Sequence, residues 1–390
     1  MSRLSEAALD DLRSRNPVAS VVERLGITLR RSGRTMVGAC PNCGGDPRRA
    51  GRFEVKDLTR WVCAVCQDGG DVIRLVERTQ GVNFRQAVEW LGGAQEIDPE
   101  VAARAAAEIA ARRAAEQATA NKKREEERER LFAIWRGAVP IERTPCYRYL
   151  EARGIAVPGL QLRAVAAMPY FHGTEKRQGR FGDYAAPRRI HEGPAMLGAV
   201  IRPDGKFGGL HITWLAPDCR AKAAIVDPDT GEILPAKKMR GSHKAGRIEL
   251  LPARGDETRL VMGEGIETTA SALMAEAPDG AAGGTLYWVA GSLGNLGSPS
   301  AGTVQHPVEK MANGHWRRVP GPVPDLDEPA IPVPEGVIEV ILIGDGDSDP
   351  WTTHRALDRG VLRHARPGRT VRKAFAPEGA DINDVLLGRG

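Results

Sequence analysis

The spacing of apolar residues changes along the chain, and each spacing predicts a different kind of element. Residues 10–25 have apolar positions at helical intervals, which predicts a helix. The segment DVIRLVERTQGVNFRQAVEWLGG, residues 71–93, predicts two short amphipathic helices broken near Gly81. Between 98 and about 136, Ala, Glu and Arg dominate and few core residues precede Leu131, so we expect an exposed linker helix there.

The C-terminal part of the chain alternates strand-like with helix-like segments. We expect strands at RLVMGEG, TLYWVAG, GVIEVILIGDGD and RTVRKAFAP, and helices at IETTASALMAEA and WTTHRALDRGVLRHA. This alternation predicts a parallel α/β sheet. The stretch between Gly291 and Gly336 is rich in Gly and Pro and is expected to be a long loop inserted into that domain.

Residues 141–255 have a third pattern, with short apolar stretches between turn signals. RPDGK at 202–206 and DPDTG at 227–231 predict the turns of β-hairpins. The sequence therefore predicts a multidomain chain of mixed α+β and α/β class. Its expected segments are 1–95 around a cysteine cluster, a helical linker at 96–140, a β-rich basic subdomain at 141–255 and an α/β domain at 256–390.

Composition adds limits to this picture. The chain has 390 residues, which suits two or three domains, and 42% of them are hydrophobic. Its net charge of +5 and pI of about 8.9 are compatible with a nucleic-acid partner. There is no run of 18 apolar residues, and the N-terminal MSRLSEAALDDLRSRN lacks the apolar core of a signal peptide. We expect a cytoplasmic protein without a membrane segment.

Four of the six cysteines have the spacing of a metal site: Cys40-x2-Cys43, nineteen residues, then Cys63-x2-Cys66. Two such pairs can enclose a zinc ion with four thiolates, which leaves no open position and predicts structural zinc. The intervening GRFEV, KDLT and RWVC predict a hairpin. Cys146 and Cys219 are expected to be buried free thiols.

The same hairpin carries basic and aromatic residues: Arg48, Arg49, Arg52, Phe53, Lys56, Arg60 and Trp61. Basic side chains among aromatic rings suit single-stranded nucleic acid, because phosphates pair with the charges and bases stack on the rings. The alternative is that the aromatic rings form the small core over the zinc. Arg52, Arg60 and Trp61 are the candidate contacts, and the arginines are the better candidates.

Acidic residues follow two of the expected strands. Glu264 comes after RLVMG, and Asp345, Asp347 and Asp349 come after VILIG. If those strands are neighbours, Glu264, Asp345 and Asp347 converge at the carboxyl edge of the sheet. Their mutual repulsion favours a divalent cation such as magnesium, which takes oxygen ligands and bridges to phosphates. Asp349 precedes Pro350 and is either the N-cap of the next helix or a further metal ligand.

Glycines surround these acids at 263, 265, 344 and 346, and we expect them to let backbone and phosphate approach closely. Glu267, one turn into its helix, is expected to be a first-turn charge rather than a ligand. Asp381 and Asp384 are expected to start a helix.

WVCAVCQDGGDVIRLVERTQGVNFRQAVEWL resembles the zinc-binding domain of DnaG-type bacterial and phage primases, and DDLRSRNPVASVVERLGITLRRSGRTMVGACPNC resembles the segment before it. The family has His as its second ligand, whereas this chain has Cys43, and a thiolate replaces the imidazole at the same spacing. The pair Glu264-Gly265 and Asp345-Gly346-Asp347 resembles the Toprim domain of primases, topoisomerases and some nucleases. The separation of 81 residues is longer than expected for the family, which the Gly- and Pro-rich insertion explains.

The resemblance implies a DNA primase that makes short RNA primers on single-stranded DNA from ribonucleoside triphosphates. It implies two-metal nucleotidyl transfer with magnesium or manganese, for which Glu264, Asp345 and Asp347 would be the catalytic, metal-holding residues. GAVIRPDGKFGGLHITWL and AKKMRGSHKAGRIEL resemble the primase basic subdomain. The candidate phosphate contacts in these segments are Lys206, Lys237, Lys238, Arg240 and Lys244; alternatively, they are solvated hairpin side chains.

Two other classes of function remain open. A Toprim nuclease would have a similar metal site, whereas 390 residues hardly allow the gate of a type I topoisomerase. A non-catalytic zinc-ribbon protein that binds single strands is the third class. No Gly-x4-Gly-Lys-Ser/Thr motif is present, which excludes a fused ATP-driven helicase. The family's helicase-contacting domain has no visible counterpart, so a replicative helicase in trans would use another surface.

Overall fold

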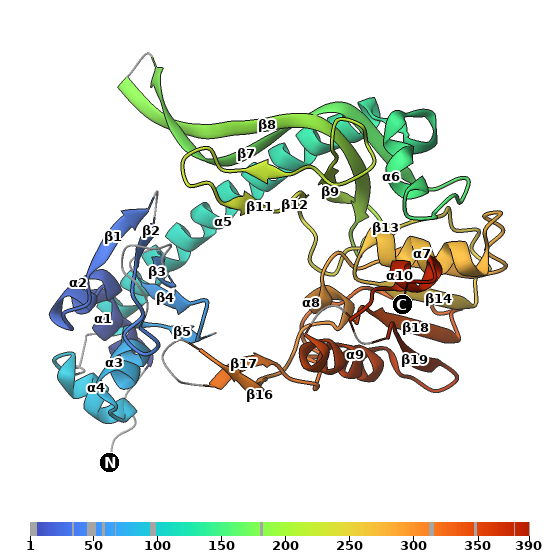
Figure 1. Ribbon diagram of the computed structural model, residues 1–390. Coiled ribbons are helices and arrows are strands. Elements are labelled where there is room, and N and C mark those ends of the chain that lie inside the picture. The colour runs from blue at the N-terminus through green and yellow to red at the C-terminus, as the bar shows by residue number, and fades with distance from the viewer. Residues whose placement is uncertain are drawn as a thin grey trace. The chain divides into compact units, whose positions relative to one another are not determined.

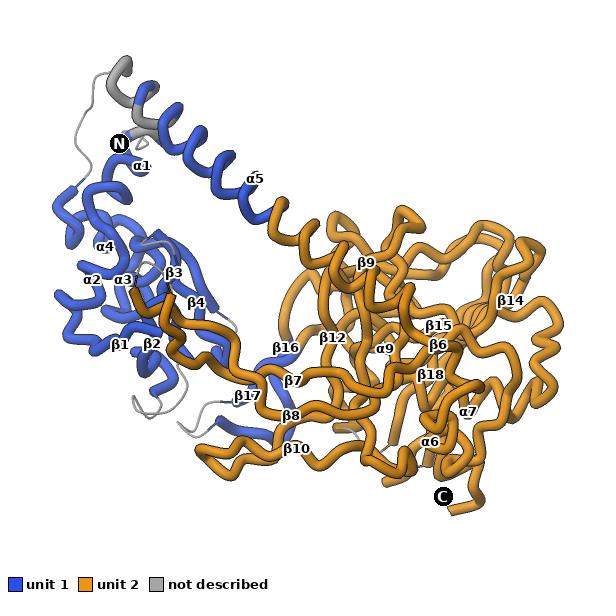
Figure 2. Tube along the Cα trace, turned by 90° about the horizontal axis from the view of Figure 1, so that it is seen from above, with its two compact units in different colours: residues 1–121, 304–319 blue, residues 122–303, 320–390 orange. Residues whose placement is uncertain are grey.

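The computed structural model describes residues 6–32, 35–44, 52–56, 59–66, 68–93, 99–179, 182–311, 316–346, 349–377 and 379–389. The chain forms two compact units (Figure 2). Unit 1 contains residues 1–121 and 304–319, and unit 2 contains residues 122–303 and 320–390. No described helix is both long and apolar enough to cross a membrane.

Unit 1 is built on an antiparallel sheet in the order β1-β2-β3-β4-β5. Its strands are β1 (Leu29–Ser32), β2 (Thr35–Gly38), β3 (Phe53–Lys56), β4 (Arg60–Cys63) and β5 (Asp68–Gly70). The pairing of β3 with β4 confirms the predicted hairpin. Phe53 and Trp61 join a core with the helical residues Leu12, Val22 and Leu75.

Four short helices complete the N-terminal part of unit 1: α1 (Glu6–Arg15), α2 (Val18–Arg24), α3 (Val72–Gln80) and α4 (Phe84–Trp90). The single helix expected at 10–25 is instead two helices, because Pro17 has no backbone N–H to continue α1. The break near Gly81 is confirmed, since this glycine ends α3 with a left-handed φ of 65°. Asn83 and Gln86 then start α4 with a capping box.

The expected linker is one continuous helix, α5 (Pro99–Gly137). Nearly every described side chain from 107 to 130 is exposed, whereas Leu131 is buried in a core of unit 2. The helix therefore belongs to unit 1 up to residue 121 and to unit 2 beyond it.

The first part of unit 2 is an antiparallel sheet in the order β12-β9-β8-β7-β6 (Figure 1). Its strands are β6 (Val139–Pro140), β7 (Leu162–Gly179), β8 (Gly182–Ile201), β9 (Phe207–Trp214) and β12 (Lys237–Gly241). A small hairpin joins β10 (Ile225–Val226) to β11 (Ile233–Leu234). Both predicted turns, at 202–206 and 227–231, connect hairpin strands.

The short apolar stretches of this region belong in part to two long strands, β7 and β8, which have 18 and 20 residues. Their pairing shifts register between Val165 and Met168 and twice between Tyr170 and Thr174. Each shift changes which face the following residues occupy. A long ribbon therefore gives a sequence pattern of short apolar pieces.

The second sheet of unit 2 has the order β13-β15-β14-β18-β19. Strands β14 (Arg259–Gly263), β15 (Thr285–Val289), β18 (Glu339–Gly344) and β19 (Thr370–Phe375) are parallel to their neighbours in this set, as the alternation of strands and helices predicted. Helices α7 (Ile266–Glu276) and α9 (Pro350–His364) follow β14 and β18. Strand β13 (Ile248–Glu249) is antiparallel to β15, and α10 (Ile382–Leu386) lies near the C-terminus.

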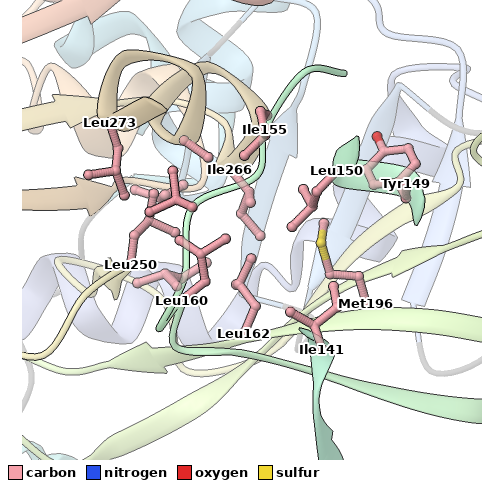
Figure 3. Packing of buried hydrophobic residues seen from close by; sticks show 14 of the residues in the cluster. Ile141, Tyr149, Leu150, Ile155, Leu160, Leu162, Met196, Leu250, Ile266 and Leu273 are labelled. Atoms are coloured by element: carbon pink, nitrogen blue, oxygen red, sulfur yellow. The ribbon is translucent and has the colours of Figure 1, made fainter. Parts of the chain in front are cut away.

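The two sheets of unit 2 share a hydrophobic core (Figure 3). It combines Tyr149 and Leu150 of α6 (Arg148–Glu151) with Met196 of β8 and Ile266 of α7. Residues on either side of position 255 therefore fold together around common contacts.

The insertion at 291–336 is not the plain loop that the composition predicted. It contains α8 (Leu293–Leu296) and a hairpin of β16 (Thr303–Lys310) with β17 (Trp316–Pro320). The sequence TVQHPVEK of β16 has few apolar residues and a proline, so it carries no strand pattern.

Candidate functional site

The four clustered cysteines in unit 1 form a closed metal site. Cys40 and Cys43 lie in the turn after β2, whereas Cys63 ends β4 and Cys66 lies in the turn after it. The Sγ atoms of Cys40 and Cys66 are 3.6 Å apart, as are those of Cys43 and Cys63, and all four lie within 4.8 Å of one another. A tetrahedral zinc thiolate site has sulfur–sulfur separations of about 3.8 Å.

The surroundings of these sulfurs fit a structural zinc ion. Cys40, Cys43 and Cys63 are buried. Four thiolates fill a tetrahedral coordination shell, so no position is left open for a substrate. Hydrogen bonding from Cys40 is the largest cause that lowers the pKa of Cys63, to about 5, and the backbone N–H of Cys66 also donates to its Sγ at 3.3 Å. Cys63 is thus favoured as a thiolate. The hydrogen bond with Cys63 raises the pKa of Cys40 and burial raises the pKa of Cys66, so binding of zinc would have to displace protons from these two thiols.

The structure corrects one candidate in the zinc hairpin. Trp61 is 2% exposed, its ring stacks on Phe53 at 5.4 Å, and its Nε1 donates to the carbonyl oxygen of Asp71 at 3.0 Å. Its ring is therefore core and cannot stack on a base. Arg60 is exposed and Arg52 is half-buried, so both stay candidate contacts; Arg48 and Arg49 lie outside the described residues.

The acidic residues of unit 2 lie where two neighbouring parallel strands end. Strands β14 and β18 pair directly, with Gly263 opposite Ile343, so Glu264 and Asp345 both follow the carboxyl ends of these strands. The hydroxyl of Thr268, in the first turn of α7, lies 3.0 Å from each carboxylate oxygen of Asp345 and donates to this group. This donor set of hard oxygens suits magnesium or manganese.

Of the other two predicted acids, the structure describes Asp349, whereas Asp347 lies outside the described residues. Asp349 is the N-cap of α9, where its side chain accepts from the backbone N–H of Thr352 at 3.1 Å, with Pro350 as the first helical residue. Asp349 therefore has the role of helix N-cap, which was one of its two interpretations from the sequence; the other was a metal ligand.

The glycines around the acids are explained by packing against the protein. A Cβ at Gly346 would lie 2.1 Å from the carbonyl oxygen of Pro377, and a Cβ at Gly263 would lie 2.6 Å from Oγ1 of Thr269. A Cβ at Gly344 would lie 2.9 Å from side-chain carbons of Thr353 and Leu357. At Gly346 the nearest atoms are backbone carbonyl oxygens, which leave no room for a side chain, whereas at Gly263 and Gly344 they belong to side chains that would have to shift. Close approach of phosphate to these glycines stays a prediction.

A buried charge cluster beside the acids was not anticipated. Glu267 is 7% exposed, and its carboxylate accepts from the Tyr149 hydroxyl at 2.6 Å and the Lys237 ammonium at 2.9 Å. The Lys222 ammonium lies 3.4 Å from the same carboxylate. Burial alone would raise the pKa of Glu267, but Lys237 and Lys222 outweigh it and hold the pKa well below its usual range.

Glu267 is thus a first-turn charge, as expected, but one with specific partners. Lys222 and Tyr149 were missed because their partner is distant in the sequence. The only sign of this cluster in the local sequence was Glu267 itself, an acidic residue three positions after Glu264.

The remaining basic candidates lie on or near the hairpins of the first sheet of unit 2. Lys206 is exposed, Lys238 donates to the carbonyl oxygen of Phe171 at 2.7 Å, and its ammonium lies 3.5 Å from the Tyr170 ring centre. Arg240 is paired with Glu127, and Lys244 with Glu328. Their contact with phosphate stays a prediction.

Comparison with protein families assigns the N-terminal segment. Residues 4–107 match the CHC2 zinc finger family of DnaG, which confirms the predicted resemblance of this segment to the zinc-binding domain of primases. Residues 125–250 match a domain of unknown function, DUF7146. No curated protein matches the sequence.

Several solved primase structures show a weak overall similarity. The chain is 14% identical to the zinc-binding and RNA polymerase domains of the Aquifex aeolicus primase, with a TM-score of 0.36, covering 100% of this chain and 83% of that one. A DNA primase domain from Pseudomonas aeruginosa gives 14% identity and a TM-score of 0.35, covering 67% and 74%.

Proposed function

We propose that this protein is a DNA primase that synthesises short RNA primers on single-stranded DNA by metal-dependent nucleotidyl transfer. The observation that carries the proposal is the presence, in one chain, of a DnaG-type zinc finger and of Glu264 and Asp345 at the carboxyl ends of adjacent parallel strands. This second feature is consistent with a Toprim domain in residues 256–390, after a basic segment at 141–255.

In this proposal the strand-end acids hold the divalent ions. Glu264 and Asp345 would supply carboxylate ligands, with Asp347 included from its position in the sequence. Thr268 would keep the Asp345 carboxylate in one orientation through its hydroxyl hydrogen bond. The bound ions would activate the primer 3′ oxygen and stabilise the leaving pyrophosphate, so no protein nucleophile is required.

Basic side chains would hold the template and the nucleotides. Arg60 and Arg52 of the zinc hairpin are the proposed contacts to single-stranded DNA. In unit 2 the proposed phosphate contacts are Lys206, Lys237, Lys238, Arg240 and Lys244. The substrates would be ribonucleoside triphosphates, and a replicative helicase would act in trans in the cytoplasm.

Primer synthesis by the full chain tests this proposal. Purified protein is incubated with single-stranded DNA, magnesium and labelled ribonucleotides, and the products are resolved on a denaturing gel. The proposal predicts short RNA products that require both template and all ribonucleotides. Cleavage of the DNA without added nucleotides, and no RNA product, would instead identify a nuclease.

A further inference from the structure

The cluster around Glu267 joins three separate segments of unit 2 at the start of α7. Tyr149 comes from α6, Lys222 from the segment between β9 and β10, and Lys237 from the first position of β12. All three side chains converge on one carboxylate that is 7% exposed. The proposed metal ligands do not include any of these four residues.

The cluster contains more positive than negative charge. Glu267 carries one negative charge, whereas Lys222, Lys237 and Arg153, whose guanidinium lies 4.1 Å from the Tyr149 ring centre, carry three positive charges. The nearby His211 is neutral at pH 7, because burial lowers its pKa to about 4. The side chains in contact with Glu267 are therefore positive in excess, whereas Asp345, which accepts from Thr268 at the start of α7, and Asp381, which lies near Tyr149, add negative charge beside them. Binding of an anion here would therefore depend on the divalent ion that the strand-end acids would hold.

Both ammonium groups keep donors for a ligand. The side chains of Lys222 and Lys237 are 39% and 35% exposed, in contrast to the buried carboxylate between them. An ammonium has three N–H donors, and in each lysine the contact with Glu267 uses one of them. Glu267 thus holds two lysines whose side chains are partly exposed, and burial lowers the pKa of Lys222.

The position of this cluster relates it directly to the strand-end acids. A Cβ at Gly265, the residue after Glu264, would lie 3.7 Å from Oε2 of Glu267 and 3.4 Å from Oγ1 of Thr268. Thr268 in turn donates to Asp345. The first turn of α7 therefore places the carboxylate that holds the lysines next to the residues that border the proposed metal site.

We propose that Glu267 is a positioning residue that holds Lys222 and Lys237 beside the strand-end acids, where the two ammonium groups bind the phosphate chain of a nucleoside triphosphate. Magnesium bridges carboxylates to phosphates, and lysine binds phosphate as a compact point charge. The substrate class rests on the proposed function, whereas the binding of a polyphosphate by this lysine pair can be measured without catalysis.

The effect of one substitution on anion affinity distinguishes a positioning role of Glu267 from a purely electrostatic one. Glu267→Gln removes a negative charge, so simple electrostatics predicts tighter binding of an anion. If Glu267 positions the lysines, the same substitution weakens binding. The Gln amide lacks the charge that attracts both ammonium groups, and it replaces one of the two acceptor oxygens with an N–H donor. Lys222→Ala removes one phosphate donor, and Lys222→Arg keeps the charge. Glu276→Gln is a control at the other end of α7, where Glu276 pairs with Arg259.

Calorimetric titration of the full chain with inorganic triphosphate in magnesium measures the binding. We expect Lys222→Ala and Glu267→Gln to raise the dissociation constant about tenfold, the size of one charge-assisted hydrogen bond. Lys222→Arg should recover part of the loss, and Glu276→Gln should bind like the original chain. Tighter or unchanged binding by Glu267→Gln, or unchanged binding by Lys222→Ala, would overturn the proposal. If Glu267→Gln does not fold, Lys222→Ala decides.

Primer synthesis by the same variants separates this inference from the proposed function. We expect KM for ribonucleotides to rise about tenfold in Lys222→Ala, with a smaller change in kcat. Primer synthesis with unchanged KM would contradict the lysine site and leave the primase proposal intact. A chain that makes no primers but loses triphosphate binding in both variants would contradict the primase proposal and support the lysine site.

Discussion

At the residue scale, Thr268 is the side chain that hydrogen-bonds directly to one of the strand-end acids, Asp345. Its hydroxyl lies 3.0 Å from both oxygens of Asp345, and the residue is 6% exposed. A hydrogen bond to this half-buried carboxylate limits the rotation of the group. Thr268 should therefore influence metal affinity more than it influences folding.

Replacing Thr268 by Val tests this role, because Val has nearly the same shape without the hydroxyl. We expect the magnesium concentration at half-maximal activity to rise about fivefold, equivalent to about 1 kcal/mol. Thr268→Ser keeps the hydroxyl and should stay near the original value. A magnesium titration of primer synthesis measures both, and identical curves for Val and Thr would show that the hydrogen bond is irrelevant.

His211 makes the stability of unit 2 depend on pH. Burial lowers its pKa to about 4, from 6.5, so the folded chain binds its proton less readily than the unfolded chain. Its contribution to the free energy of unfolding is complete above pH 6.5 and is lost as the pH falls towards 4, by about 3 kcal/mol. Urea unfolding across this range should show a shallower dependence on pH in His211→Gln. The exposed His243→Gln is the control, and equal slopes for both variants would contradict the effect.

At the element scale, short-range signals predicted well and long-range partners did not. The break near Gly81 was predicted from the sequence, and this glycine is the C-cap of α3. Trp61 could have been surface or core, because a hairpin pattern does not say which face is covered. Glu267 has partners 118 and 30 residues away, and no local pattern encodes such distances.

The register of a sheet also escapes a local pattern. The irregular pairing within β7 concealed a strand of 18 residues, and β16 has too few apolar residues to be recognised. The strand-end position of the acids could be predicted because the alternation of strands and helices implies parallel strands. The pairing of β14 with β18, and the contacts of Lys222 and Tyr149, could be found only in the folded chain.

The zinc turns are the element whose removal should have the most local effect. Cys63→Ser should abolish binding of about one zinc ion per chain and loosen residues 35–70, since structural zinc contributes on the order of 10 kcal/mol to a small domain. Unit 2 has its own cores and should stay folded. Metal analysis and hydrogen exchange measure these effects, with Cys146→Ser as a control that keeps its zinc. Normal exchange in zinc-free protein would contradict a structural role.

At the scale of the whole molecule, the two units provide different parts of one proposed activity. Unit 1 holds the zinc finger with its exposed Arg60, and unit 2 holds the acids and the lysine cluster. The chain has 55 basic and 50 acidic residues, so its affinity for DNA must come from local charge rather than from the net charge of +5.

Salt dependence measures how many of these local charges meet phosphate. With about four to six contacts, the log–log slope for single-stranded DNA should be roughly −3 to −4, and Arg60→Ala should flatten it by about 0.7. Arg85 is exposed on α4, and Arg85→Ala should leave the slope unchanged. Fluorescence anisotropy with a labelled oligonucleotide gives these slopes, and equal slopes for all three proteins would remove Arg60 from the interface.

The central claim is that Glu264 and Asp345 hold the metal for primer synthesis. Its most direct measurement is the initial rate of template-dependent RNA synthesis by Asp345→Asn and Glu264→Gln, beside Glu335→Gln, an exposed acid of the same unit. We predict that both site variants fold normally and lose at least about a hundredfold in rate, since bound metal supplies several kcal/mol to the transition state, whereas Glu335→Gln keeps full activity. Undiminished synthesis by both folded site variants would contradict the account.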